Sequence, residues 1–139
     1  MKEAILFNFF ISSFMFGVII VTQIVNYPLL LDFLRSDIKH LHNSYVNKIS
    51  KIVIPSMLLE LITALYLVYN GIHLSYINFG LLIFIYISTF FIQVPIHNNI
   101  KHNYDMSLFK KLIFSNWIRT FCWFFKTVVS VNIILKEVL

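Results

Sequence analysis

Charge, glycine and cysteine are all scarce in this sequence. Asp, Glu, Lys and Arg together make up only 12% of its 139 residues, against about 25% in an ordinary soluble domain. So little charge cannot give the chain a water-soluble surface. The single cysteine, Cys122, excludes an internal disulfide and a cysteine-based metal cluster within one chain. The three glycines form no glycine-rich phosphate-binding loop.

What the chain has instead is long hydrophobic runs. Hydrophobic residues make up 59% of it, and the mean hydropathy is +0.82. The four runs are residues 4–31, 52–69, 77–96 and 112–135. A helix needs roughly 20 apolar residues to cross a bilayer, so each run predicts a transmembrane helix. The first run lacks a strongly basic start and a small-x-small cleavage site, and we interpret it as a retained span rather than a signal peptide.

The net charge of +5 comes from basic residues that lie mostly between the apolar runs. The connections 32–51 and 97–111 hold seven of them: Arg35, Lys39, Lys48, Lys51, Lys101, Lys110 and Lys111. The turn 70–76 holds none, and each terminal segment holds one. Because cytoplasmic loops carry the excess of Lys and Arg, we expect both long connections in the cytoplasm and both termini outside a cell (inner) membrane. Basic residues placed beside a bilayer in this way do not indicate a nucleic-acid partner.

The connection 32–51 is patterned like a helix. Leu34, Ile38, Leu41 and Tyr45 recur in it at helical spacing, which predicts an interfacial helix leading into the second span. We therefore expect one all-α domain, residues 1–139. It would be a polytopic membrane protein with four transmembrane helices in an antiparallel bundle and the interfacial helix between the first and the second.

Two of the three prolines have similar surroundings. Pro28 in "NYPLLLDF" and Pro95 in "QVPIHNNI" each follow a polar residue by two positions at the cytoplasmic end of a predicted span. We expect these prolines, with Pro55, to loosen the helix ends. The likeness is too short to predict an internal repeat.

Each predicted span contains one strongly polar residue well inside the apolar run. These are Gln23, Glu60, Gln93 and Arg119, each eight or nine residues from a charged residue at the cytoplasmic edge. At 1.5 Å per residue, that is roughly 12–14 Å into the membrane. The four side chains are therefore expected at one depth.

Helical spacing brings further polar residues to the same faces. The sets are Gln23 with Asn26 and Tyr27, Gln93 with His97, and Arg119 with Asn116, Thr120 and Trp123. His42 and Tyr45, on the predicted interfacial helix, could cover this region from the cytoplasmic side. The pattern predicts a polar pocket that opens to the cytoplasm between walls of Phe, Leu and Ile.

A charge at mid-membrane costs about 2.5–3.5 kcal/mol on insertion scales. We therefore expect Glu60 and Arg119 to face inward and form a hydrogen-bonded pair, with neighbouring amides satisfying their remaining groups. Lys126, deeper in the fourth span, is expected to snorkel outward. An alternative is that the polar side chains only hold the helices together. His42 and His97 are the histidines expected at the pocket, as proton carriers or ligands.

At "QVPIHNNI" and "NWIRT" the last third of the chain resembles the anthrone-oxygenase-like family of small four-helix membrane proteins. Its members end the third helix with Asn-x-Pro-x-Asn and carry Asn-x-x-Arg in the fourth. Asn116 and Arg119 match the second motif directly, whereas Gln93 and His97 replace both Asn of the first. The resemblance implies pocket chemistry around Asn116 and Arg119. In a few fungal members such chemistry is associated with cofactor-free oxygenation of polycyclic phenols.

Three functions fit these features. The first is a small membrane enzyme, oxygenase-like or an oxidoreductase, that takes an apolar aromatic or quinone-like molecule from the lipid bilayer and needs no cofactor. Arg119 would hold a developing oxyanion, and His97 or Glu60 would move the proton. The residues expected to bind the substrate are Asn116, Gln93, Gln23, Tyr27, His42 and Tyr45.

The second function is a haem- or metal-binding redox protein that uses His42 and His97, because imidazoles from two helices can clamp a haem. The third is a non-catalytic membrane subunit or assembly factor. A single copy with four spans is a poor transporter, although a homo-oligomer could enclose a path.

Overall fold

The protein is helical throughout the part of the chain that the computed structural model describes. This part comprises residues 1–32, 35–102 and 105–139, with the backbone alone for 35–38. Its elements are α1 (Lys2–Val21), η1 (Thr22–Asn26), α2 (Tyr27–Leu31), α3 (Arg35–Tyr69), α4 (Ser75–Ser88), η2 (Thr89–Gln93), α5 (Val94–His102) and α6 (Met106–Glu137). The two η elements are single π-helical turns.

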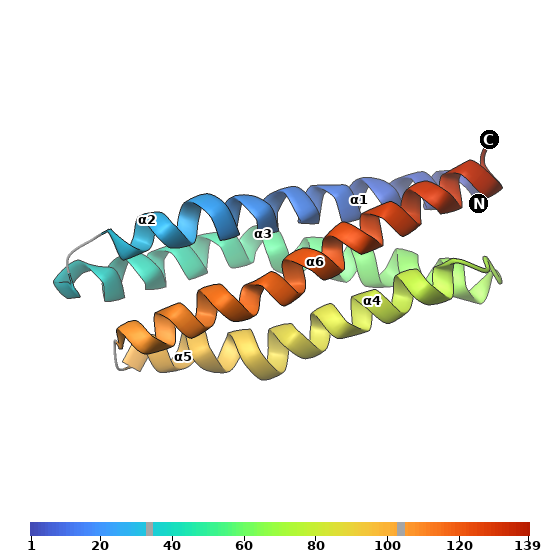
Figure 1. The fold of residues 1–139 in the computed structure, drawn as a ribbon. Helices are drawn as coiled ribbons and strands as arrows, with labels where there is room; N and C mark the ends of the chain where they lie inside the picture. The colour runs from blue at the N-terminus through green and yellow to red at the C-terminus, as the bar shows by residue number, and fades with distance from the viewer. Residues whose placement is uncertain (33–34, 103–104) are drawn as a thin grey trace.

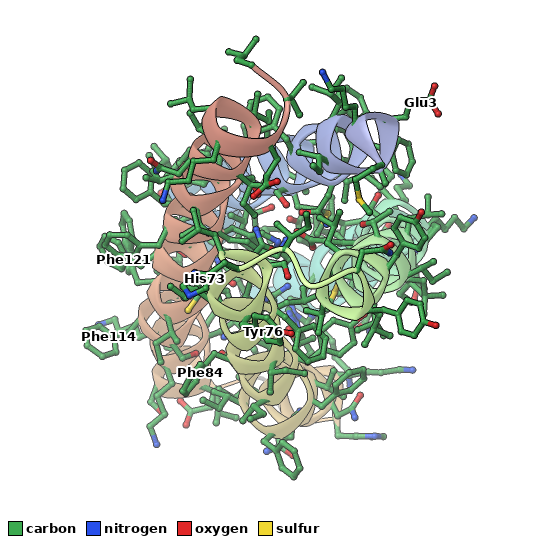
Figure 2. The ribbon with its side chains drawn as sticks, turned by 90° about the vertical axis from the view of Figure 1, so that its right-hand side faces the viewer. Glu3, His73, Tyr76, Phe84, Phe114 and Phe121 are labelled. Atoms are coloured by element: carbon green, nitrogen blue, oxygen red, sulfur yellow. The ribbon has the colours of Figure 1, made fainter. Side chains whose placement is uncertain are left out.

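These elements join into four rods that are long and apolar enough to cross a membrane: Lys2–Leu31, Lys39–Tyr69, Ser75–His102 and Met106–Glu137. Each predicted apolar run lies inside one of them, so each run forms a helix long and apolar enough to span a membrane. Phe84, Phe114 and Phe121 point away from the helices (Figure 2) and are 63%, 81% and 55% exposed. So many exposed aromatic side chains would form large apolar patches in water, so this surface suits a multi-pass membrane protein.

The four rods lie side by side, and both termini lie at the same end of the molecule as the turn between α3 and α4 (Figure 1). The ends of α2 and α5 and the beginnings of α3 and α6 lie at the opposite end. α1 packs against α3 and α6, and α4 packs against the same two helices. Each rod therefore has two neighbours, and the four surround a shared interior.

Local chemistry sets the ends of the rods. Gly71 has a φ of 72° just after α3, a left-handed conformation that glycine adopts without strain at a helix C-terminus. The carboxylate of Asp105 caps α6 by accepting a hydrogen bond of 3.0 Å from the backbone N–H of Ser107. Lys2 Nζ donates to the carbonyl of Val138 over 2.9 Å and ties the two termini together.

The helix predicted within 32–51 is present from residue 35 as the first part of α3, which runs unbroken for 35 residues and contains Pro55. Of the residues that predicted it, Leu34 lies outside the described residues and Ile38 is described by its backbone only. Leu41 and Tyr45 pack against a buried cluster at this end of the bundle. The cluster consists of Tyr27, Leu30, Ile100, Phe109 and Leu112.

The two π-helical turns occupy matching places in the first and third rods. η1 ends two residues before Pro28, and η2 ends two residues before Pro95. A proline in a regular helix clashes with the carbonyl four residues earlier, and a wider turn relieves that clash. Each π turn therefore follows from its proline. The short likeness noted in the sequence corresponds to the same local structure in both halves of the chain.

Threonine hydroxyls support both wide turns. Thr22 Oγ1 donates to the carbonyl of Val18 over 2.9 Å, and Thr89 Oγ1 donates to that of Ile85 over 2.7 Å. Gln23 and Gln93 lie within the two turns and are buried in the interior, 3% and 1% exposed. The π turns thus place two amide side chains inside an otherwise apolar bundle.

Candidate functional site

Two clusters of buried polar side chains lie along the middle of one face of α6. Arg119, Trp123 and Lys126 share this face because they are four and three residues apart. Trp123 contacts both clusters. Its ring lies 5.3 Å from the guanidinium carbon of Arg119, and its Nε1 donates to Glu60 Oε2 over 3.1 Å.

The cluster nearer the termini, which we call the acid–base cluster, consists of Ser12, Glu60, Trp123 and Lys126. Glu60 Oε1 and Lys126 Nζ form a salt bridge of 2.9 Å, and both side chains are fully buried. Ser12 Oγ donates to Glu60 Oε1 over 2.9 Å, and Lys126 Nζ donates to Ser12 Oγ over 2.8 Å. Three helices, α1, α3 and α6, are thereby joined at one point.

This geometry corrects two predictions. Glu60 pairs with Lys126 and not with Arg119, and Lys126 points into the bundle instead of snorkelling outward. The depth of Glu60 was counted from Lys51 as if the helix began there. α3 in fact begins at residue 35 and continues through Lys51. Lys51 on α3 and Lys111 on α6, the two charges from which depth is counted, are therefore not at one level.

The second cluster holds Arg119 through a chain of amides. Arg119 Nη1 donates to Asn116 Oδ1 over 3.3 Å, and Asn116 Nδ2 donates to Gln23 Oε1 over 2.8 Å. Gln23 Nε2 in turn donates to the carbonyl of Ile113 over 3.0 Å. This series of hydrogen bonds links η1 to α6 and fixes one edge of the guanidinium. Asn116 and Gln23 therefore position Arg119.

Arg119 is buried without a neutralising partner in the described part of the chain. Its side chain is 7% exposed, and its Nε atom has no hydrogen-bond partner there. The buried carboxylate of Glu60 is paired with Lys126 and not with Arg119. The described structure therefore leaves the positive charge of Arg119 available to another molecule.

A cavity of about 220 Å³, the inner cavity, lies beside Arg119. Its walls are mainly aliphatic side chains of α1 and α3, such as Ile19 and Val53. The polar side chains that line it include Thr22, Tyr27, Tyr45, Gln93, His97 and Arg119. Gln93 Nε2 donates to Ser115 Oγ over 2.8 Å, but its Oε1 is buried with no partner. An apolar cavity with a few polar groups is the usual form of a small-molecule site.

The inner cavity also reaches the outer surface of the bundle. Ile54, Phe90 and Val94 line it and are 58%, 57% and 40% exposed. Ile54 belongs to α3, and the other two belong to the third rod. The inner cavity therefore reaches the surface between these two rods, at apolar side chains.

A second cavity of about 150 Å³, the outer cavity, lies next to the first, between the first part of α3 and α5. Its lining is polar and consists of His42, Asn43, Val46, Asn47, His97, Asn98 and Lys101. Val46 and His97 line both cavities. These two side chains therefore form the wall between a polar and an apolar compartment.

His42 and His97 are in direct contact. His42 Nε2 and His97 Nδ1 share a hydrogen bond of 2.9 Å, and the rings stack with centroids 5.0 Å apart. A metal held between two imidazoles keeps their nitrogens roughly 4 Å apart, since each metal–nitrogen bond is about 2 Å. A haem iron therefore does not fit between these rings as they stand. No group of three or more His, Cys, Asp or Glu suited to a metal occurs among the described residues.

The structure brings together most of the residues predicted for the site. Arg119, Gln93, His97, Tyr27 and Tyr45 line the inner cavity, while Asn116 and Gln23 support Arg119 from behind. His42 lines the outer cavity, and Glu60 lines neither. Sequence reasoning missed Ser12 and misplaced Lys126. Extending the polar stripe of α6 by one helical turn beyond Trp123 would have included Lys126.

No known protein family, characterised protein or solved structure matches this chain. Its function must therefore be argued from the geometry of the two cavities.

Proposed function

We propose that the chain crosses a cell membrane as an antiparallel bundle of four helices, with both termini outside and the connections 32–51 and 97–111 in the cytoplasm. The excess of Lys and Arg in those connections supports this orientation. α3 has 35 residues, about 52 Å of helix, which exceeds a hydrocarbon core of about 30 Å. Its first turns would therefore lie at the cytoplasmic interface, as the sequence pattern predicts.

Within this bundle, we propose a membrane enzyme that takes a flat apolar molecule bearing an acidic oxygen, such as a phenol or a quinone-like compound, from the bilayer. One observation carries the proposal: Arg119 is buried beside an apolar cavity with no carboxylate in contact among the described residues. A buried charge is costly unless it is paired and hydrogen-bonded. An anionic oxygen in the cavity would supply that pairing.

The polar groups around the cavity suit proton removal. His97 would accept the proton of the bound molecule, and Arg119 would stabilise the resulting oxyanion. Asn116 and Gln23 would keep the guanidinium aimed at that oxygen. The resemblance of Asn116 and Arg119 to the Asn-x-x-Arg motif of the anthrone-oxygenase-like family implies that such an anion could then react with oxygen without a cofactor.

The proposal is tested by binding of 2-hydroxyanthraquinone and its neutral analogue 2-methoxyanthraquinone to the protein in lipid nanodiscs. We expect the hydroxy compound to bind about 10-fold more tightly or better, because a hydrogen bond to a charged group contributes about 1.5–3 kcal/mol. Arg119→Gln should remove this preference and leave the binding of the methoxy compound unchanged.

A matched pair of variants tests whether the ligand occupies the inner cavity. Val53 lines it, whereas its neighbour Ile52 does not and is 45% exposed. Val53→Trp should fill the cavity and block both ligands, and Ile52→Trp should leave their binding unchanged. Binding that is insensitive to Val53→Trp, or absent from the wild-type protein, would contradict the enzyme proposal. It would favour a non-catalytic subunit.

A further inference from the structure

His97, in the wall between the two cavities, is hydrogen-bonded to His42, which lines the outer cavity. His42 Nε2 and His97 Nδ1 share the hydrogen bond of 2.9 Å. The remaining nitrogen of His42, Nδ1, is buried and has no hydrogen-bond partner among the described residues. The remaining nitrogen of His97, Nε2, makes no hydrogen bond to the described residues. Each ring thus has one nitrogen in the shared bond and one left over.

The two cavities on either side of this pair differ in polarity. The outer cavity is lined by three asparagines and by Lys101, and Asn47, Asn98 and Lys101 are exposed. Its 150 Å³ exceeds several-fold the roughly 10–15 Å³ that one water needs. The inner cavity is walled mainly by aliphatic side chains and offers water few partners. In a bundle surrounded by lipid, a proton released there would reach water only toward the outer cavity.

We propose that His42 and His97 form a proton relay that connects the inner cavity with water in the outer cavity. His42 is thereby given a role that depends on His97: it does not touch the substrate, but it exchanges protons with the residue that does. The relay rests on the function proposed above, because it serves the ligand bound at Arg119.

The relay conserves protons and changes no oxidation state. In the outward direction Nε2 of His97 takes the proton of the ligand, and the hydrogen on Nδ1 of His97 passes to Nε2 of His42. The hydrogen on Nδ1 of His42 then leaves toward the outer cavity, which His42 lines. Both imidazoles are neutral before and after, with their hydrogens moved from Nδ1 to Nε2. In this second tautomeric state the pair is ready to return a proton to the ligand by the reverse steps.

The test uses the colour change of 2-hydroxyanthraquinone on protonation as the readout. The dye is bound as the anion to the protein in nanodiscs, the buffer is acidified by stopped flow, and the rate of protonation of bound dye is measured. We expect His42→Ala and His42→Gln to slow this rate about 10- to 100-fold, the scale of a lost acid–base group. Affinity for the dye should stay unchanged. His40→Ala is the matched control, because His40 is an exposed histidine of the same helix that lines neither cavity.

Chemical rescue separates a relay from a structural role. Imidazole added in solution should restore the rate in His42→Ala, where it can occupy the vacated space, but not in His42→Gln, where the side chain fills it. An unchanged rate in either variant, with the dye bound, would overturn the relay and leave the ligand site intact. Failure of the wild-type protein to bind the dye would overturn both proposals.

Discussion

Glu60 and Lys126 form a salt bridge of 2.9 Å in the interior of the bundle, where neither side chain is exposed. Ser12 and Trp123 complete the hydrogen bonds around the carboxylate. Removing one partner of a buried pair leaves an uncompensated charge, which costs about 3–5 kcal/mol. The pair therefore fastens α3 to α6. Because it neutralises Glu60, it also leaves Arg119 without that carboxylate.

A double-mutant cycle tests this pair. Glu60→Gln and Lys126→Met should each lower the free energy of unfolding in detergent by about 3–5 kcal/mol, because each leaves a buried charge unpaired. The double variant should lose clearly less than the sum of the two, because it buries no lone charge. The measurement is denaturant unfolding followed by tryptophan fluorescence.

The control cycle combines Glu60→Gln with Arg119→Gln. The two side chains share no hydrogen bond or salt bridge in the structure, although Trp123 lies against both. Because they are linked only through Trp123, their coupling should be clearly smaller than that between Glu60 and Lys126. Coupling between Glu60 and Arg119 larger than that between Glu60 and Lys126 would restore the pairing predicted from the sequence and contradict the structure.

The partner of Glu60 could not be predicted by counting residues, for a physical reason. Counting gives depth only when every helix starts at the same level, and α3 continues through the connection that was taken as its edge. Hydrophobic runs locate a span well, since their length is set by the bilayer. They do not fix the register of one span against another. That register is set by contacts such as the salt bridge itself.

The faces of the helices were easier to predict than their register. Periodicity alone placed Gln23, Asn116 and Arg119 in the interior, where they form one hydrogen-bonded chain. Contact between His42 and His97 was beyond prediction, because it depends on how α3 and α5 approach each other. The π turns were also missed, although Thr-x-x-x-polar-x-Pro occurs in both "TQIVNYP" and "TFFIQVP". This shared pattern is the signal that could have found them.

The orientation in the membrane can be tested by cysteine labelling. In a Cys122→Ala background, the single substitutions His73→Cys and Asn99→Cys would report on which side of the membrane each end of the bundle lies, because both positions are exposed. A membrane-impermeant thiol reagent added to intact cells should label position 73 and leave position 99 unlabelled until the cells are opened. The reverse pattern would place both termini in the cytoplasm and contradict the rule that Lys and Arg face inward.

The support of Arg119 by Asn116 gives a further prediction. Asn116→Ala removes the hydrogen bond to the guanidinium and leaves Gln23 Oε1 without its donor. We expect binding of 2-hydroxyanthraquinone to weaken about 2- to 10-fold, the effect of one lost hydrogen bond. Binding of the methoxy analogue should not change. Asn132→Ala is the control, because Asn132 is an exposed asparagine of the same helix that bonds only to the backbone. Equal weakening of both ligands would show that Asn116 shapes the cavity instead of aiming Arg119.

The last prediction separates a reactive site from a set of polar contacts that only hold helices together. If His97 is structural, its replacement should harm stability and activity in parallel. If it moves protons, the protein should fold and bind ligand without it but lose the reaction. His97→Asn is the suitable change, because it supplies the residue that the resemblance to the anthrone-oxygenase-like family would place here, and it keeps a polar side chain beside His42.

We expect His97→Asn to fold, to insert in the membrane and to bind 2-hydroxyanthraquinone as the wild-type protein does, since Arg119 and its supports are untouched. The free energy of unfolding should fall by about 1 kcal/mol, the contribution of one hydrogen bond. Oxygen uptake with anthrone, a polycyclic substrate that must lose a proton before it reacts, should fall about 100-fold or more, because an amide cannot act as the base.

The same variant should also lose the rapid protonation of bound dye, since His42 would have no imidazole to exchange with. A variant that keeps the full rate of oxygen uptake would remove His97 from the reaction, and the proton would have to leave by another group that lines the inner cavity.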